Sequence, residues 1–229
     1  MTQYPLQPIR SESKMTHVGP AARNAPLIIL ASSSPRRREL LAEDGYSFTV
    51  VPPDEDVECG VCSESGPAGL VCELALRKAA AVVKMLKDDM SRESFQCPNL
   101  QDAVVLAADT VAECEGFILG KPLDEHDARK MLKQLSAREH RVLTGVCLWR
   151  LSDHKSLVRV AVTRLKMDAL SDEQMDDYIA SGQWEGKAGA FGYQDRLGWI
   201  HVVEGSESNV VGLPMETLAE MLAEITESQ

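Results

Sequence analysis

The chain has 229 residues, of which 44% are hydrophobic, and its formal net charge is −11. This size and composition are typical of one domain, or one domain of two lobes, with a sizeable core, and they exclude an intrinsically disordered protein. The negative charge excludes an extended nucleic-acid surface, because a phosphate backbone needs a broad basic face. A small anionic ligand stays open, provided that cations gather locally.

The sequence also bears on location and partners. Its apolar runs are far shorter than the roughly 20 residues of a membrane span, and residues 1–24 lack the apolar stretch of a secretory signal. We therefore predict a cytoplasmic protein with no membrane and no nucleic-acid polymer as partner, and leave a homodimer open. Cys59 and Cys62 form a C-x-x-C pair, and we expect ordinary reduced thiols there in preference to a metal or redox site.

The N-terminal part of the chain predicts a tail followed by a strand and a helix. Residues 1–25 are rich in Pro, Ser, Arg and Gln without apolar periodicity, so we expect a flexible tail before one domain over residues 26–229. The apolar run 27–31 is typical of a buried strand. A helix is expected from Pro35, with Ser34 as its N-cap.

An acidic loop and a long helix come next. Residues 52–69 predict a loop with a small acidic cluster, and residues 67–90 predict a helix. Lys78 falls on the otherwise apolar stripe of that helix. Its ammonium group must either reach solvent past apolar surface, which is the commoner case, or meet an acidic or anionic partner.

The remaining pattern predicts a mixed sheet. An apolar strand is expected at 103–108, with Asp109 at its end, and a hairpin at 113–120. The further expected elements are a helix capped by Asp124, hairpin strands at 142–151 and 156–167, a helix with a capping box at Ser171 and Gln174, a glycine-rich segment at 182–192, a strand at 199–203, a loop at 205–212 and a helix at 214–225. Strands alternate with helices early and hairpins come late, which predicts an α/β fold with a mixed sheet.

The segment between the first strand and the first helix is a candidate phosphate site. It contains Ser34, Arg36 and Arg37, and helix N-terminal N–H groups, hydroxyls and guanidinium groups all favour bound phosphate. Arginines in a first turn are unfavourable for a merely structural helix, because the helix dipole there disfavours cations. The alternative is a solvated basic face.

Three further places could carry chemistry. Asp109 stands at the sheet edge where open α/β sheets bind ligands, and it could hold a metal, orient a water or cap a turn. Lys121 lies between a glycine and a proline, although most loop lysines are solvated. The glycine-rich segment around Lys187 and Gln194 could approach a nucleobase or could equally be a plain flexible loop. Together these residues indicate nucleotide hydrolysis.

Short sequence blocks follow one another in a specific order: 30–37 (LASSSPRR), 108–111 (ADTV), 120–122 (GKP), 135–136 (LS), 140–145 (HRVLTG), 186–194 (GKAGAFGYQ) and 208–214 (SNVVGLP). These blocks resemble the Maf nucleotide pyrophosphatases over essentially everything but the tail. The resemblance implies a fold related to the inosine-triphosphate pyrophosphatases, with two lobes around a cleft. It also implies hydrolysis of a nucleoside triphosphate to the monophosphate and pyrophosphate with a divalent metal, Mg²⁺ or Mn²⁺.

The resemblance further implies residue roles. Asp109 would accept the proton of the attacking water with help from the metal, Gln194 would help to read the base, and Glu55 is the best choice for the acidic metal ligand expected within 54–58. The substrate-binding set comprises Ser34, Arg36, Arg37, Lys78 and Lys121, with Lys187 in a block expected to converge on the same cleft.

Substrate choice within the family can also be weighed. Arg36 and Gln194 resemble the dTTP/UTP branch, because the 7-methyl-GTP branch usually has an aromatic residue in place of that arginine and lacks the glutamine. A purine nucleotide pyrophosphatase and a nucleotide-binding regulator of septum formation stay as alternatives. Two residues depart from the family pattern by replacing a usual glycine. Asp195 could alter the base pocket, whereas Ala137 is expected to change only a turn.

Overall fold

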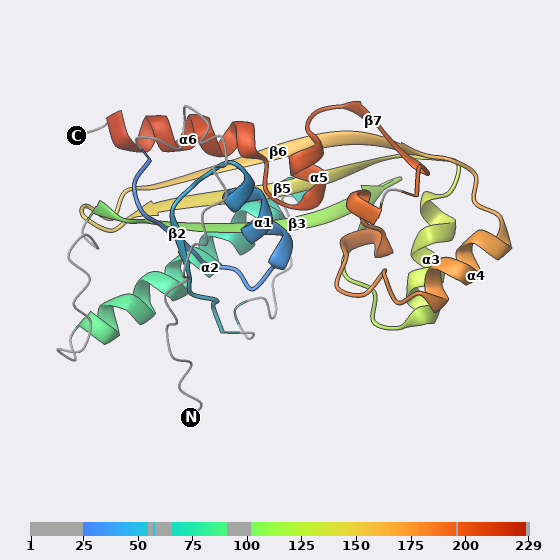
Figure 1. The fold of residues 1–229 in the computed structure, drawn as a ribbon, viewed down its shortest axis with the longest axis horizontal. Coiled ribbons are helices and arrows are strands. Elements are labelled where there is room, and N and C mark those ends of the chain that lie inside the picture. Colours follow the sequence, from blue (N-terminus) through green and yellow to red (C-terminus); the bar gives the residue numbers. More distant parts are fainter. Residues whose placement is uncertain (1–24, 55–56, 58–65, 91–101, 196, 228–229) are drawn as a thin grey trace.

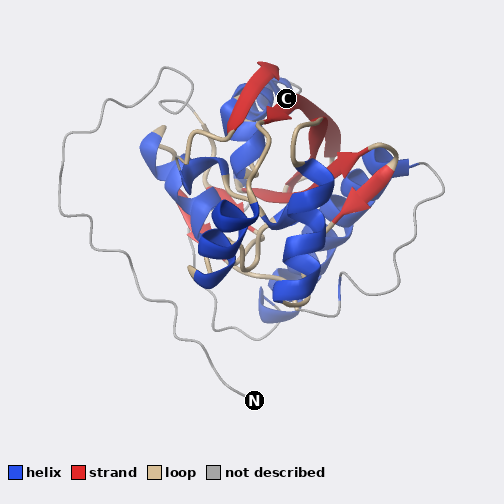
Figure 2. Ribbon diagram, turned by 90° about the vertical axis from the view of Figure 1, so that its right-hand side faces the viewer, coloured by secondary structure: helices blue, strands red, loops and turns tan. Residues whose placement is uncertain are grey.

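The computed structural model of the protein describes residues 25–54, 57, 66–90, 102–195 and 197–227. Nearly all of the predicted tail lies outside these residues. The described chain forms a seven-stranded mixed sheet with the strand order β2-β1-β3-β5-β6-β7, and β4 pairs with β3. Helices cover both faces of this twisted sheet (Figures 1 and 2). The predicted α/β fold with a mixed sheet is therefore confirmed.

The parallel part of the sheet lies at one edge. β1 (Ile28–Leu30) pairs in parallel with both β2 (Phe48–Val50) and β3 (Val104–Cys114). Helix α1 (Pro35–Glu43) connects β1 to β2, and the 25-residue helix α2 (Gly66–Met90) precedes β3. These elements match the predicted strand, helix and long helix.

The antiparallel part is built from hairpins. β3 turns into β4 (Phe117–Leu119), and β5 (Glu139–Arg150) pairs along almost its whole length with β3 and with β6 (Ser156–Met167). β7 (Ile200–Glu204) pairs with the C-terminal part of β6. The predicted hairpins at 113–120 and 142–167 are thus confirmed.

Two apolar cores make the two lobes. In the first, α6 (Met215–Glu227) packs on one face of β1, β3 and β5 while α2 packs on the other. In the second, α3 (Glu125–Leu135) and α4 (Asp172–Ala180) pack against the far ends of β5 and β6, at the right of Figure 1. Asp124 caps α3, and Ser171 and Gln174 form the predicted capping box of α4.

Two local predictions are wrong. The strand predicted to end before Asp109 continues to Cys114, because β5 goes on pairing with it up to Glu113. The predicted loop at 205–212 contains a short helix, α5 (Glu207–Val211), which is too brief to show apolar periodicity. No helix in the described ranges is long and apolar enough to span a membrane.

A gap beside β3 positions the site. On one edge of β3, β1 pairs only as far as Leu106, and β4 pairs only from Ala112 onward. In the described chain no strand occupies this edge between those two residues, and Asp109 lies within the interval. The sheet therefore opens beside a strand that stays continuous, and this opening replaces the predicted strand end as the place for a ligand.

Candidate active site

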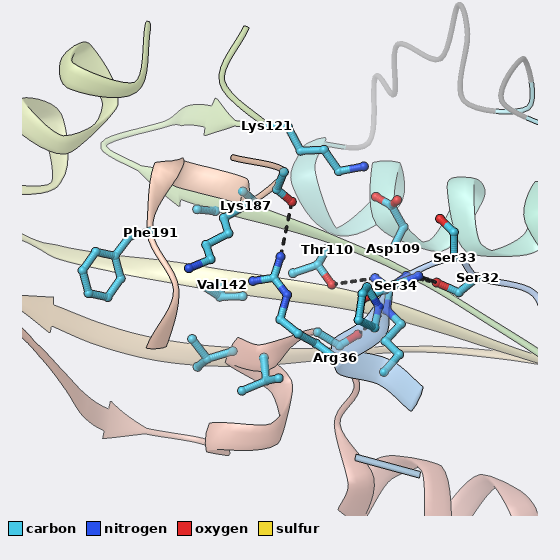
Figure 3. A pocket seen from close by; sticks show the side chains of 18 of the residues that line it. Ser32, Ser33, Ser34, Arg36, Asp109, Thr110, Lys121, Val142, Lys187 and Phe191 are labelled. Atoms are coloured by element: carbon cyan, nitrogen blue, oxygen red, sulfur yellow. Dashed lines mark hydrogen bonds between the residues drawn. The ribbon is translucent and has the colours of Figure 1, made fainter. Parts of the chain in front are cut away.

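A cleft of about 800 Å³ lies between the two lobes. Figure 3 shows Phe191 and Lys187 toward one end, Asp109 and Ser33 toward the other, and Arg36 between them. All but one of the predicted substrate-binding residues line it, namely Ser34, Arg36, Arg37, Lys78, Lys121 and Lys187, together with Asp109. The structure thus brings together residues that are far apart in the sequence.

The N-terminus of α1 opens into the cleft. Ser34 is its N-cap, as predicted, but its side chain makes no capping hydrogen bond. The first turn of α1 has no acidic residue, so its N–H groups and the Ser34 hydroxyl face the cleft without a carboxylate nearby in that turn. This arrangement suits a bound phosphate.

The two arginines of this turn are used differently. The Arg36 guanidinium makes one long hydrogen bond of 3.4 Å to the Gly186 carbonyl across the cleft. The Arg37 guanidinium donates to the Gly212 carbonyl (2.8 Å), to Ser32 Oγ (3.0 Å) and to Thr110 Oγ1 (3.2 Å). Arg37 therefore ties α1 to β3 and to the end of α5, whereas Arg36 has most of its donors left for a ligand.

A buried ion pair lies in the gap beside β3. Lys78 of α2 is 6% exposed and Asp109 is 9% exposed, and Lys78 Nζ lies 2.5 Å from Asp109 Oδ1. The commoner expectation for Lys78, that it reaches solvent, is wrong, and the alternative of an acidic partner is correct. Within the described residues nothing donates a hydrogen bond to Asp109 Oδ2, so this oxygen is left for a water or a metal.

A glycine in β5 allows α2 to come close enough for this pair. Gly145 lies directly opposite Asp109 in the β3–β5 ladder. A Cβ at Gly145 would stand 2.3 Å from the Val71 carbonyl oxygen of α2, a distance that no side chain tolerates. In the sequence, Gly145 belongs to the block 140–145 and has no assigned role, and its close approach to α2 supplies one.

The cleft contains further charged side chains at this end. Lys121 is exposed and forms no ion pair with any residue in the described ranges. Asp54 also lines the cleft, while Glu55, the predicted metal ligand, lies outside the described residues. No group of three or more metal-binding side chains occurs among the residues described. Any cation here would thus rely on one or two carboxylates plus oxygens of the ligand.

The other end of the cleft is mostly apolar. Its lining residues are Ala112, Leu135, Val142, Leu165, Phe191, Ile200 and Val210, with His140. His140 is 5% exposed, and burial lowers the pKa of its imidazole, although the Arg138 backbone carbonyl acts in the opposite direction. The imidazole is neutral near pH 7, so it adds no charge to the apolar side chains at this end, and such side chains suit a nucleobase.

A second ion pair lies beside the apolar end. Lys187 Nζ is 2.5 Å from each carboxylate oxygen of Asp195, and the Tyr178 hydroxyl donates to Asp195 Oδ2 at 2.7 Å. The sequence predicts Lys187 as a substrate-binding residue and marks Asp195 only as a departure from the family pattern. Gln194 lies between Tyr193 and Asp195 in the short helix η5 (Tyr193–Asp195), and its side chain is not described.

Residues 27–225 match the family model described as Maf-like protein. This range includes the sheet, the cleft and both ion pairs.

Several relatives are named dTTP/UTP pyrophosphatase. The chain is 49% identical over 205 residues to a dTTP/UTP pyrophosphatase of Rhodopirellula baltica, with 89% of this chain and 84% of the relative covered. It is 43% identical over 198 residues to a protein of that name from Symbiobacterium thermophilum (86% and 93% covered). It is 41% identical over 198 residues to one from Pelotomaculum thermopropionicum (85% and 94% covered).

Proposed function

Because this chain belongs to the family of Maf-like proteins, we propose that it is a nucleoside triphosphate pyrophosphatase that hydrolyses dTTP and UTP. The products are the nucleoside monophosphate and pyrophosphate. The relatives named dTTP/UTP pyrophosphatase support this choice of substrates. Arg36, which stands where the 7-methyl-GTP branch usually has an aromatic residue, supports it as well.

One observation carries the proposal: a single cleft has a cationic end around a buried carboxylate and an apolar end. Lys121 and the N-terminus of α1 provide positive charge for a triphosphate at one end, and Arg36 adds positive charge between the two ends (Figure 3). Asp109 lies at the same end, and the apolar side chains around Phe191 lie at the other. A nucleoside triphosphate has the same division between charged and flat apolar parts.

The reaction follows from this division. A water molecule held at Asp109 Oδ2 attacks the α-phosphorus and gives its proton to the carboxylate. The new bond joins the water oxygen to the α-phosphorus, the bond between the α-phosphorus and the oxygen that bridges to the β-phosphate breaks, and pyrophosphate leaves with that bridging oxygen. Arg36 and Lys121 stabilise the charge on the leaving group, so positioning and electrostatics supply most of the rate.

Lys78 has a different part in this reaction. Its ammonium group, 2.5 Å from Asp109 Oδ1, balances the charge of the buried carboxylate and fixes its orientation. Since Lys78 occupies Oδ1, the water is directed to Oδ2. A lysine on an apolar helix face is thus explained by the carboxylate that it holds.

We expect a divalent cation, Mg²⁺ or Mn²⁺, to be required. Asp109 and Asp54 line the same cleft, and Mg²⁺ is usually held by one or two carboxylates together with substrate phosphates. The residues therefore fit such an ion. When bound, it would neutralise phosphate charge.

A substrate panel tests the proposal. Purified protein with Mg²⁺ or Mn²⁺ is incubated with dTTP, UTP, CTP, GTP and 7-methyl-GTP, and pyrophosphate release is measured. We expect dTTP and UTP to give the highest kcat/KM. Orthophosphate in place of pyrophosphate, or a preference for GTP or 7-methyl-GTP, contradicts the proposal. Binding without any release would favour the nucleotide-binding regulator.

Isotope labelling locates the attacked phosphorus. In H₂¹⁸O we expect the label in the nucleoside monophosphate and none in pyrophosphate. Label in pyrophosphate would mean attack at the β-phosphorus and would contradict this mechanism.

A further inference from the structure

The Lys187–Asp195 pair has no role in the proposed reaction. The two side chains are only 11% and 9% exposed, and both carboxylate oxygens accept from the ammonium group. The Tyr178 hydroxyl adds a third hydrogen bond to the carboxylate. Both oxygens of Asp195 are therefore engaged within the protein, as is much of the hydrogen-bonding capacity of Lys187.

This pair connects three segments of the base end. Lys187 precedes the short helix η4 (Ala188–Ala190), Asp195 ends η5, and Tyr178 belongs to α4. A Cβ at Gly192 would come within 2.6 Å of Lys187 Nζ, so the ammonium group lies directly against the turn between η4 and η5. The pair therefore fixes the path of the chain from Lys187 to Asp195.

The same connection positions an aromatic side chain of the cleft. The Tyr178 ring packs against Phe191 at a centroid distance of 5.6 Å and against Trp199 at 5.8 Å. Phe191 lines the cleft. The hydroxyl of Tyr178 therefore contacts the ion pair, and its ring contacts Phe191 in the wall of the cleft.

A second anchor lies on the other side of Gln194. The Tyr193 hydroxyl donates to Glu207 Oε1 of α5 at 2.7 Å, and Asp195 holds the following position. Both neighbours of Gln194 are thus fixed by side-chain contacts to separate elements. A residue between two such anchors has little backbone freedom.

We propose that Asp195, acting through Lys187 and Tyr178, is a positioning residue that fixes the base end of the cleft and so sets base preference. In this inference, which rests on the proposed function, Lys187 serves the protein wall and does not bind the triphosphate. A phosphate that took the ammonium group would leave a buried carboxylate without its cation, which is costly. Arg36 and Lys121 are available without that cost.

A double-mutant cycle tests the inference. The variants are Asp195→Asn, Lys187→Met and the two together, and the readouts are kcat, KM for UTP and GTP, and Kd for the non-hydrolysable α,β-imido-UTP. Each single change is expected to raise KM and Kd for the uracil nucleotides by about tenfold, with kcat changed less than about threefold. The double variant should be no worse than either single one, because both remove the same interaction.

Other outcomes overturn the inference. If Lys187→Met weakens binding strongly while Asp195→Asn leaves it unchanged or tighter, Lys187 binds phosphate. Unchanged UTP-to-GTP preference in all three variants also contradicts it. If the unaltered protein binds α,β-imido-UTP but does not hydrolyse UTP, only the proposed function is contradicted. If it does not bind α,β-imido-UTP, the proposed function and this inference are both overturned.

Control variants separate positioning from loss of folding. Tyr178→Phe keeps the ring and loses one hydrogen bond, so KM should rise only about threefold. Lys187→Arg retains the cation and should restore KM to within about threefold of the unaltered protein. Asp168→Asn makes the same acid-to-amide change at an exposed pair with His201, outside the cleft lining, and should leave KM and Kd unaltered. Thermal unfolding checks that each variant is folded.

Discussion

The two ends of the cleft each contain a buried lysine–aspartate pair, and the pairs differ in how much of the carboxylate is occupied. Lys78 and Asp109 come from α2 and β3, 31 residues apart, and meet through one oxygen. Lys187 and Asp195 are eight residues apart and meet through both oxygens, with Tyr178 as an additional donor. A carboxylate with one oxygen that accepts from none of the described residues can take up a proton in the cleft, whereas a carboxylate engaged through both oxygens serves as an anchor.

The largest effect is expected from Asp109→Asn, which removes the proton acceptor and keeps the shape. We expect kcat to fall by about 10²–10⁴-fold, the range of general-base catalysis, with a much smaller change in KM. Steady-state measurement of pyrophosphate release checks this. Asp168→Asn is the matched control and should leave kcat unchanged. Near-normal turnover in Asp109→Asn would remove the distinction between the two carboxylates.

The next largest effect is expected on stability, from Lys78→Met. This change leaves the Asp109 carboxylate buried without its cation, so the free energy of unfolding should fall by about 3–5 kcal/mol. Urea unfolding measures it. Lys187→Met should cost less, because Tyr178 continues to donate to Asp195.

The double variant Lys78→Met with Asp109→Asn serves as the control for this prediction. It removes the stranded charge and should regain most of the lost stability. If the double variant is as unstable as Lys78→Met, the loss of stability comes from packing around α2 and not from the unpaired charge of Asp109.

A somewhat smaller loss is expected when α2 is pushed away from the sheet. In Gly145→Ala the new Cβ collides with the Val71 carbonyl, and overpacking of this kind costs about 1–3 kcal/mol. Activity should fall as well, because Lys78 moves relative to Asp109. Gly120→Ala, where no atom lies within 4 Å of the added Cβ, is the stability control. A stable Gly145→Ala variant with normal kcat would mean that the Lys78–Asp109 geometry tolerates displacement.

The Lys78–Asp109 pair could be predicted only in part from the sequence. An apolar run ending in Asp109 and a helical stripe interrupted by Lys78 were both visible, but the pairing depends on which face of β3 meets α2. On β3, Val105 and Ala107 pack in the same core as α2, so the two-residue period places Asp109 on that side. Because the strand was expected to stop at 108, this argument could not be made from the sequence.

The base end was less predictable for a different reason. Its elements are short, η4 and η5 having three residues each, so they show no periodicity and depend on contacts from other elements. The Asp195 carboxylate is positioned by Lys187 and by Tyr178 of α4, and nothing in the local pattern around Asp195 indicates either partner. Long elements with repeated apolar spacing, such as α2 and β6, were predicted to within one residue, and β5 begins three residues before its predicted start.

The smallest predicted effect concerns backbone strain, which also separates the two ends. Ala137 has φ of 61° and Ala190 has φ of 59°, and both lie near the base end, whereas no non-glycine residue among those described at the phosphate end has a positive φ. A left-handed alanine costs about 1–2 kcal/mol, partly offset by the extra freedom that glycine gives the unfolded chain. Ala137→Gly should therefore stabilise the protein by about 0.5 kcal/mol in urea unfolding, and kcat should not change.

An alanine of ordinary helical conformation provides the opposite sign. Ala223 is exposed in the middle of α6, where glycine costs about 0.5–1 kcal/mol. Ala137→Gly and Ala223→Gly remove the same methyl group, so a difference in sign isolates the backbone contribution. If both variants lose stability equally, Ala137 is not strained. The base end would then be held by its side-chain contacts alone, with the Lys187–Asp195 pair as the buried, charged part of them.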